Sequence, residues 1–268
     1  MWPWALAFFS GQVAKPERVQ AAEKTYTIAM DTTFPPFEFA DKNNKRVGID
    51  IDLIRAIAKA EGFKVQLKAT SFNGAVQELQ ANQVDGVMAG MSITPERKKV
   101  FAFSDPYYQS GVVMAVAKKG HITKLSQLRG KRVAVKTGTA SADYANSSKK
   151  KYGFKTVTFD DSNNVYQDVI SGNSAACFED KPVMQYAIAT GLGLKLGNMK
   201  MAMANDYGIA VSKSNPELVK KINAGLKKVR KSGEYTKIVE KYLAMGPRPT
   251  RIKRPRKPTT PAAPSWAY

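Results

Sequence analysis

Short apolar segments typical of strands alternate with amphipathic segments typical of helices along most of this 268-residue chain. The first run has strand patterns at 26–30, 64–70 and 84–90, separated by helical patterns at 50–63 and 73–83. Asp50 is the expected cap of the first helix and Gly62 its expected end. Strands that alternate with helices need crossover connections, and such units build a mainly parallel sheet with helices on its faces. The sequence therefore predicts an α/β fold.

The same alternation starts again in the second half of the chain. Strand and helix patterns follow one another at 131–139, 141–153, 155–160, 163–173, 174–180 and 181–191. Two further amphipathic patterns, at 215–233 and 234–243, close this part of the chain with helices. Two similar α/β units are the predicted organisation.

Two apolar strand patterns connect these units, at 107–120 and at 205–213. Each has a glycine near its start, Gly111 and Gly208, where the backbone can absorb a change of direction. Two crossovers between two lobes would form a hinge, with a ligand cleft between the lobes. The alternative is that both are ordinary core strands of a single domain, and periodicity alone does not decide between the two.

The two-lobed interpretation sets the domain boundaries. It predicts a discontinuous lobe 1 at 25–108 and 209–245, and a lobe 2 that includes the hinge crossovers at 109–208. Residues 1–24 are expected to form a leader or extension. Their apolar run resembles an export signal, but no positive charge precedes it.

The net charge of +20 is partly concentrated in the last segment, 246–268. This segment holds six Lys or Arg residues and six of the fourteen prolines, so we expect a basic, disordered tail. It is either a weak anchor for an anionic polymer or membrane surface, or an incidental extension. The other lysines are spread over helix faces and nucleic-acid-binding signatures are absent, so no nucleic-acid partner is expected.

The cysteine and histidine counts exclude several kinds of site. Cys177 is the only cysteine, which rules out an intramolecular disulfide. His121 is the only histidine and lies in a polar stretch typical of a loop, which argues against a histidine-based catalytic triad and a multi-histidine metal site. No cofactor or metal is expected. No segment has the 18 or more apolar residues that a membrane-spanning helix needs.

Five motifs, in this order between Thr25 and Leu243, carry a family resemblance: DTTFPPFEF, GIDIDLI, AGMSITPERKKVFAFSDPYY, AVKTGTAS and CFEDKPV. The chain resembles the polar amino-acid-binding proteins of bacterial ABC importers. It is especially similar to glutamine-binding proteins and to the substrate-binding domains fused to glutamine transporters of Gram-positive bacteria. The resemblance implies a two-lobed, type II periplasmic-binding-protein-like fold and a non-enzymatic, monomeric protein. Such a protein captures an L-amino acid outside the cytoplasm, in the periplasm or at the Gram-positive cell surface, and delivers it to a membrane permease.

The resemblance also assigns residues to the two charged groups of an amino acid. Arg97, with its planar fork of donors, is expected to bind the α-carboxylate. Gly90 and Ser92 are expected to add backbone and hydroxyl donors. Thr139 and Ala140, at a predicted helix start, are expected to add backbone N–H groups.

The remaining assignments concern the ammonium group and the side chain of the ligand. The resemblance pairs Asp180 with the ammonium group and places Phe34 and Phe72 on either side of the side-chain stem. Asp31 would accept a hydrogen bond from a side-chain amide and Lys136 would donate one to its oxygen. Without the resemblance, the two rings read as core aromatics and Asp180 as a capping residue.

Glutamine is therefore the expected ligand, but arginine, lysine or broad polar amino-acid binding stays open. Glu179 stands where Gram-negative glutamine binders have a histidine, and a carboxylate at this position favours a more cationic ligand. A second alternative is an enzyme similar to the cyclohexadienyl dehydratases, which share this fold. Glu179 beside Lys136 would then form an acid/base pair.

Overall fold

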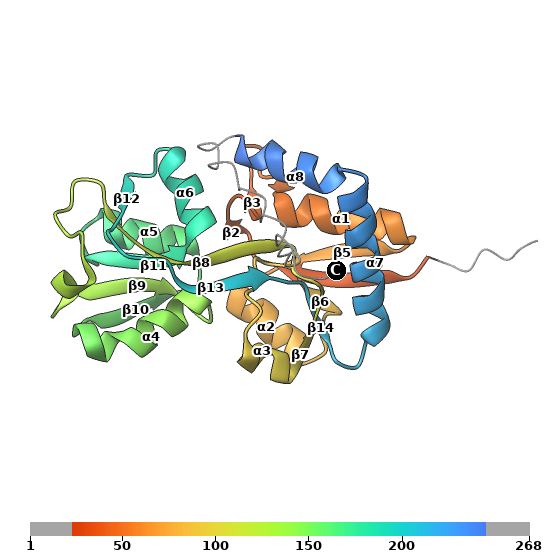
Figure 1. The fold of residues 1–268 in the computed structure, drawn as a ribbon, viewed down its shortest axis with the longest axis horizontal. Helices are drawn as coiled ribbons and strands as arrows, with labels where there is room; N and C mark the ends of the chain where they lie inside the picture. Colours follow the sequence, from red (N-terminus) through yellow and green to blue (C-terminus); the bar gives the residue numbers. More distant parts are fainter. Residues whose placement is uncertain (1–22, 245–268) are drawn as a thin grey trace, which may run out of the picture.

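Two sheets, one in each half of the molecule, organise the fold (Figure 1). The computed structural model describes residues 23–244, so the predicted leader and basic tail lie almost entirely outside the described residues. Within the described range the protein is a mixed α/β fold of two lobes, as the alternating pattern predicts.

The sheet of lobe 1 has the strand order β5-β1-β6-β14-β7. Its strands are β1 (Thr25–Met30), β5 (Lys64–Ala69), β6 (Gly86–Val87), β7 (Phe101–Phe103) and β14 (Ala210–Ser212). Strand β1 is parallel to β5 and β6, whereas β14 is antiparallel to β6 and β7. A small antiparallel sheet adds β2 (Thr33–Phe34), β3 (Glu38–Ala40) and β4 (Arg46–Val47).

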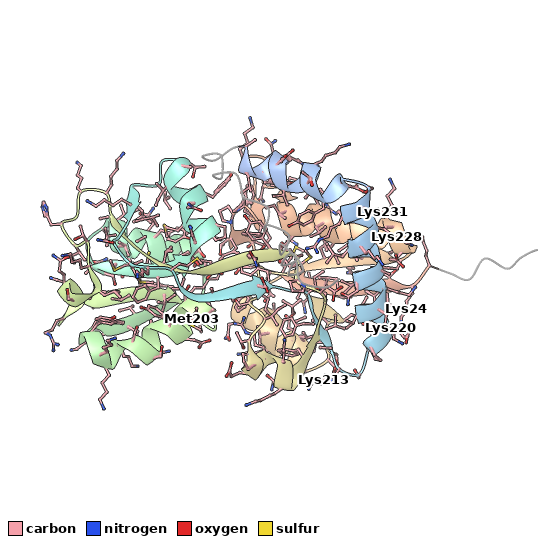
Figure 2. All side chains as sticks on the ribbon, in the orientation of Figure 1. Lys24, Met203, Lys213, Lys220, Lys228 and Lys231 are labelled. Carbon is pink, nitrogen blue, oxygen red and sulfur yellow. The ribbon has the colours of Figure 1, made fainter. Side chains whose placement is uncertain are left out.

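Helices cover both faces of this sheet (Figure 1). One face carries α1 (Ile49–Glu61), α7 (Pro216–Lys231) and α8 (Glu234–Leu243), and the other carries α2 (Phe72–Gln80) and α3 (Pro95–Val100). Helix α7 buries the apolar stripe of Leu218, Ile222, Leu226 and Val229 in the larger core. Its outward face carries lysines such as Lys220, Lys228 and Lys231 (Figure 2), so much of the positive charge lies on solvated helix surface.

Lobe 2 is built on a second sheet with the order β10-β9-β11-β8-β12, and β13 pairs with β8 outside this path. Its strands are β8 (Tyr108–Ala117), β9 (Arg132–Lys136), β10 (Lys155–Phe159), β11 (Ala176–Asp180), β12 (Leu194–Leu196) and β13 (Ala202–Tyr207). The short 3-10 helix η1 (Leu125–Leu128) precedes β9, and the α-helices are α4 (Ala140–Tyr152), α5 (Ser162–Ile170) and α6 (Lys181–Ala189). Strand β9 is parallel to β10 and β11, but β8 is antiparallel to β11, β12 and β13. The expected parallel sheet is therefore mixed wherever the crossover strands join it.

Strands β8 and β13 run between the two lobes (Figure 1) and pair with each other through Tyr108↔Tyr207 and Ser110↔Asn205. Neither Gly111 nor Gly208 has a positive φ, so backbone freedom does not explain them. A Cβ atom at Gly111 would lie 2.7 Å from Met201 Cγ, and one at Gly208 would lie 2.7 Å from Ile93 Cδ1. Both glycines permit close packing at the crossovers.

The ends of the first helix differ from the pattern-based expectation at one point. Gly62 adopts the left-handed conformation and ends α1, as predicted. Asp50, which the sequence suggested as the N-cap, instead lies in the first turn and is completely buried, while Gly48 is the N-cap. Among residues 23–244, the helices are too short or too polar to cross a membrane.

Candidate ligand site between the lobes

Every residue that the sequence proposed as a ligand contact lines one pocket, together with Ala89. Lobe 1 contributes Asp31, Phe34, Phe72, Gly90, Ser92 and Arg97. Lobe 2 contributes Lys136, Thr139, Ala140, Glu179 and Asp180. The pocket therefore lies between the two halves of the molecule, where the carboxyl ends of several strands meet.

Arg97 is positioned by the short helix α3, where the Thr94 side chain caps the first turn by accepting from Arg97 N at 3.2 Å. Its guanidinium donates to the carbonyl oxygens of Ser92 at 2.8 Å and of Gly138, from lobe 2, at 2.9 Å. It also lies 5.3 Å from the centroid of the Phe72 ring. Burial lowers the pKa of Arg97, but a guanidinium stays charged throughout the physiological range. A guanidinium has five N–H donors, and those that do not bind the carbonyl oxygens of Ser92 and Gly138 are available to an anion.

The start of helix α4 faces the same pocket from lobe 2. Thr139 caps it, accepting from Ala142 N at 3.2 Å and donating its hydroxyl to Lys136 O at 2.8 Å. Ala140, the first residue of this 13-residue helix, lines the pocket. Unpaired N–H groups and the helix dipole favour negative charge at such a position. Arg97 and α4 therefore make one part of the pocket attractive to an anion.

Two buried carboxyl groups, Glu179 and Asp180, lie where β11 ends. Asp180 accepts from the Tyr207 hydroxyl at 2.5 Å and from the Ser141 hydroxyl at 3.3 Å. Glu179 accepts from the Tyr166 hydroxyl and from Asp180 N, both at 2.9 Å. Burial is the main cause that raises the pKa of both carboxyls, and with the charge of Asp180 it brings the pKa of Glu179 to about 7. This part of the pocket suits a cation.

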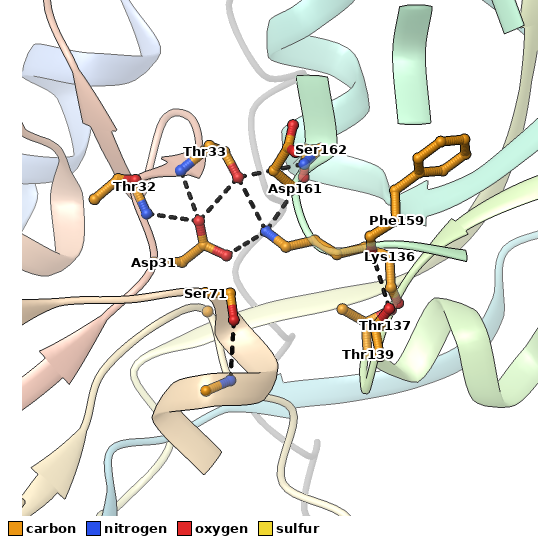
Figure 3. Close-up of polar contacts among 12 residues, drawn as sticks. Asp31, Thr32, Thr33, Ser71, Lys136, Thr137, Thr139, Phe159, Asp161 and Ser162 are labelled. Carbon is orange, nitrogen blue, oxygen red and sulfur yellow. Dashed lines mark hydrogen bonds and ion pairs between the residues drawn. The ribbon is translucent and has the colours of Figure 1, made fainter. Parts of the chain in front are cut away.

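Asp31 and Lys136 form an ion pair across the cleft, with both side chains 3% exposed (Figure 3). Asp31 also accepts from the backbone N–H groups of Thr32 at 2.5 Å and Thr33 at 2.7 Å. Lys136 donates to the hydroxyls of Thr33 at 3.2 Å and Ser162 at 3.4 Å. The sequence placed these two charges at the ligand, and the structure adds that they contact each other and bridge the lobes.

Several residues around the pocket escaped the motif-based reasoning. The Thr33 hydroxyl accepts from Ser162 N at 3.3 Å and so links the lobes, and the Ser162 hydroxyl donates to Glu179 at 3.4 Å. Tyr166 and Tyr207 fix the two buried carboxylates. The serine follows a capping aspartate at a helix start and the two tyrosines interrupt apolar patterns, signals that favour helix starts and core packing over a binding site.

Gly90 departs from the expected role as a backbone donor. Its N–H donates to Asp50 Oδ2 at 2.8 Å, inside lobe 1, and is therefore engaged within the protein. Its φ of 52° lies in the left-handed region, and an added Cβ would lie 2.4 Å from Phe34 Cε1. Glycine is thus required here both for the backbone conformation and for the approach of the Phe34 ring.

We expect Gly90→Ala to weaken ligand binding by about tenfold or more, because the methyl group displaces the Phe34 wall, and to destabilise the fold by roughly 1–3 kcal/mol. Calorimetric titration and thermal denaturation measure the two effects. Gly172→Ala is the matched control, since Gly172 has a φ of 80° but open space around it. The control should lose stability without losing affinity; equal binding by both variants would contradict the steric argument.

The chain matches the family model of bacterial extracellular solute-binding proteins, family 3, over residues 26–245. ABC transporter arginine-binding protein 1 of Escherichia coli K12 is 32% identical over 83% of this chain and 92% of its own length. An ancestral arginine-binding protein is 40% identical, with a TM-score of 0.76, over 82% of this chain and 98% of its own. It has been solved with arginine and with glutamine.

These relatives are named as binding proteins, not as enzymes, which supports the binding interpretation over the dehydratase one. The match covers both lobes and all the motifs that carried the resemblance. The two-lobed fold agrees with that of the solved relatives. The chain therefore belongs to the bacterial extracellular solute-binding proteins, family 3.

Proposed function

We propose that this protein captures a polar L-amino acid between its lobes and delivers it to an ABC importer. One observation carries the proposal: a single pocket places Arg97 and the start of α4 in reach of an anion and the buried Asp180 in reach of a cation. An α-amino acid is a zwitterion whose two charges are separated by a single carbon atom. The carboxylate would bind Arg97, Ser92 and the N-terminus of α4, and the ammonium group would bind Asp180.

The walls of the pocket suit a side chain with a flat or partly apolar stem. Phe34 and Phe72 line it, and both rings are nearly buried. Because the N–H of Gly90 is engaged by Asp50, the hydrogen-bonding group that Gly90 offers is its carbonyl oxygen, which suits an ammonium group. In this proposal, Gly90 therefore accepts a hydrogen bond from the ligand ammonium group instead of donating one to the ligand carboxylate.

Glutamine is the preferred ligand in this proposal. Asp31 is an acceptor and Lys136 is a donor, and a carboxamide presents the complementary pair. Replacing their direct contact by two hydrogen bonds to the amide keeps both charges satisfied. Arginine would bring a second cation against Lys136, and glutamate a second anion against Asp31.

Arginine is the second candidate. Relatives named as arginine-binding proteins support it, as does the ancestral arginine-binding protein solved with either ligand. Glu179 supplies a further carboxylate in the pocket, and above its pKa of about 7 it is ionised and favours a cationic side chain. This candidate predicts that arginine binding strengthens relative to glutamine binding as pH rises from 6 to 8.

Opening and closing of the lobes would couple binding to transport. We place the moving boundary at the crossovers near Gly111 and Gly208, between lobe 1 (25–108 and 209–245) and lobe 2 (109–208). Closure would create the surface that a membrane permease recognises. A relative named as an ABC transporter protein and the family description as extracellular support a location outside the cytoplasm, in the periplasm or at a Gram-positive surface. The proposal further takes the protein to be a monomer.

Calorimetric titration tests the proposal. The protein is unfolded and refolded to remove carried ligand, then titrated with glutamine, arginine, asparagine, glutamate and histidine. We expect one-to-one glutamine binding near micromolar affinity, about −8 kcal/mol, and weaker arginine binding. Tighter binding of arginine than of glutamine would favour the second candidate. No detectable binding of any of the five amino acids would overturn amino-acid capture.

A further inference from the structure

Two carboxyl groups lie behind the pocket without lining it. Glu38 belongs to β3 and Asp50 to the first turn of α1, and both are 0% exposed. Each is joined to a pocket wall. Glu38 pairs with Phe34 across strands β2 and β3, and Asp50 accepts from the N–H of Gly90.

The hydrogen bonds of the two groups are unequal. Asp50 Oδ2 accepts from Gly90 N and from the Tyr107 hydroxyl, both at 2.8 Å. Within residues 23–244, Asp50 Oδ1 and both oxygens of Glu38 have no donor. The N–H of Asp50 donates to the carbonyl oxygen of Phe37, the residue before Glu38, at 2.9 Å, so the two acidic residues lie on adjacent backbone segments. A hydrogen bond between their carboxyl groups can form only when one of them carries a proton.

The surroundings decide which group carries that proton. Two donors stabilise a charge on Asp50, and the pKa of Asp50, raised mainly by burial, is about 6. Glu38 has no such donors, and burial first, then the charges of Asp50 and Asp31, raises its pKa well above the ordinary value. Lys136 is the one cation that opposes this effect on Glu38. Of the two groups, Asp50 is therefore the better placed to carry a charge and Glu38 the better placed to hold a proton.

We propose that Glu38 and Asp50 share one proton and act as a positioning unit for the Gly90 and Phe34 walls of the pocket. The Glu38 hydroxyl donates to Asp50 Oδ1, which leaves Asp50 Oδ2 directed at the Gly90 N–H and the Tyr107 hydroxyl. Gly90 is thereby held against the Phe34 ring, in its left-handed conformation with a φ of 52°. The effect on affinity rests on the amino-acid function proposed above, whereas the shared proton does not.

The sign of the pH dependence follows from this arrangement. While Glu38 is protonated, the unit carries a single negative charge. When alkaline pH removes that proton, two buried anions face each other, the charge of Asp31 adds to their repulsion, and the charge of Lys136 opposes it. The Tyr107 hydroxyl remains a donor in this range, because burial and the charges of Asp50 and Glu38 raise its pKa well above the ordinary value. Ligand affinity therefore falls as pH rises above neutrality.

Two variants separate the shared proton from simple burial. In Glu38→Gln, the amide N–H₂ replaces the carboxyl hydroxyl as donor and cannot ionise. In Glu38→Leu, the volume is kept approximately but the donor is lost. Wild type and both variants are titrated with L-glutamine and L-arginine at pH 7 and pH 9, and affinities are compared as variant-to-wild-type ratios, so that titration of the ligand's own amino group cancels.

We expect Glu38→Gln to bind within about twofold of wild type at pH 7 and to lose less affinity than wild type at pH 9. Glu38→Leu should bind at least about tenfold more weakly at pH 7. Wild-type binding that falls no more than that of Glu38→Gln at pH 9, or Glu38→Leu that binds as well as Glu38→Gln, would overturn the positioning role. If Glu38→Leu does not fold, the pH comparison between wild type and Glu38→Gln decides.

A second readout needs no ligand. Infrared spectroscopy of wild type at pH 7 should show a protonated-carboxyl band that is missing from Glu38→Gln. Absence of a band difference would overturn the shared proton itself. A band difference without binding of either amino acid would instead leave the shared proton standing and contradict the proposed function, so the two failures are distinguishable.

Discussion

Replacing Arg97 with alanine is expected to weaken amino-acid binding by at least about a hundredfold, about 3 kcal/mol. The guanidinium is the strongest anion-binding group in the pocket, and alanine would leave the ligand carboxylate buried against only Ser92 and the N-terminus of α4. Its contact with the Gly138 carbonyl also joins the lobes, so the variant should close less readily. Calorimetric titration with glutamine and arginine measures the loss.

Lys98→Ala is the matched control, because Lys98 lies on the same short helix but is exposed. This variant removes the positive charge next to Arg97 in the chain, from a side chain that does not line the pocket. The control should bind as wild type does, and both variants should keep the circular dichroism of the fold. Wild-type affinity in Arg97→Ala would place the carboxylate site elsewhere.

Replacing Lys136 with methionine is expected to reverse the ligand preference. The change removes the donor that would read a glutamine amide oxygen and leaves Asp31 buried without its ion-pair partner. Breaking one side of a buried pair costs about 3–5 kcal/mol of folding stability. A ligand cation that pairs with Asp31 recovers part of that cost, so arginine should stabilise the variant more than glutamine does.

Thermal shift and calorimetric titration, each with glutamine and arginine, measure this reversal. Glutamine affinity should fall by roughly a hundredfold and arginine affinity should rise, relative to wild type. Lys155→Met is the control, since Lys155 is an exposed lysine at the start of the neighbouring strand β10. If Lys136→Met still prefers glutamine, Lys136 does not read the ligand side chain.

The sequence predicted which residues lie close together where strand ends determine position. Asp31 follows β1, Gly90 follows β6, Lys136 ends β9 and Asp180 ends β11. In an open α/β sheet these ends converge on one edge, so residues far apart in the chain meet without any further information. The motifs indicated the same residues, and in the structure these residues line one pocket.

What the sequence did not predict depends on contacts between distant segments. The Asp31–Lys136 pair and the bond from Ser162 N to Thr33 need the two lobes to be brought together. Asp50 looked like a helix cap because its local sequence fits one, and only tertiary packing against Gly90 and Tyr107 turns it inward. The antiparallel direction of the crossover strands could not be predicted either, because hydrophobic periodicity indicates which face of a strand is buried and not the direction in which the strand runs.

The pairing of β8 with β13 has a mechanical consequence. Two independent linkers would let the lobes twist, slide and tilt, but these strands are hydrogen-bonded to each other and form one ribbon. A pleated ribbon bends easily across its face and resists sliding of one strand along the other, because sliding breaks the ladder. In the opening and closing proposed above, motion between the lobes would therefore be restricted mainly to a single bending coordinate, and opposing pocket walls would return to the same alignment in each cycle.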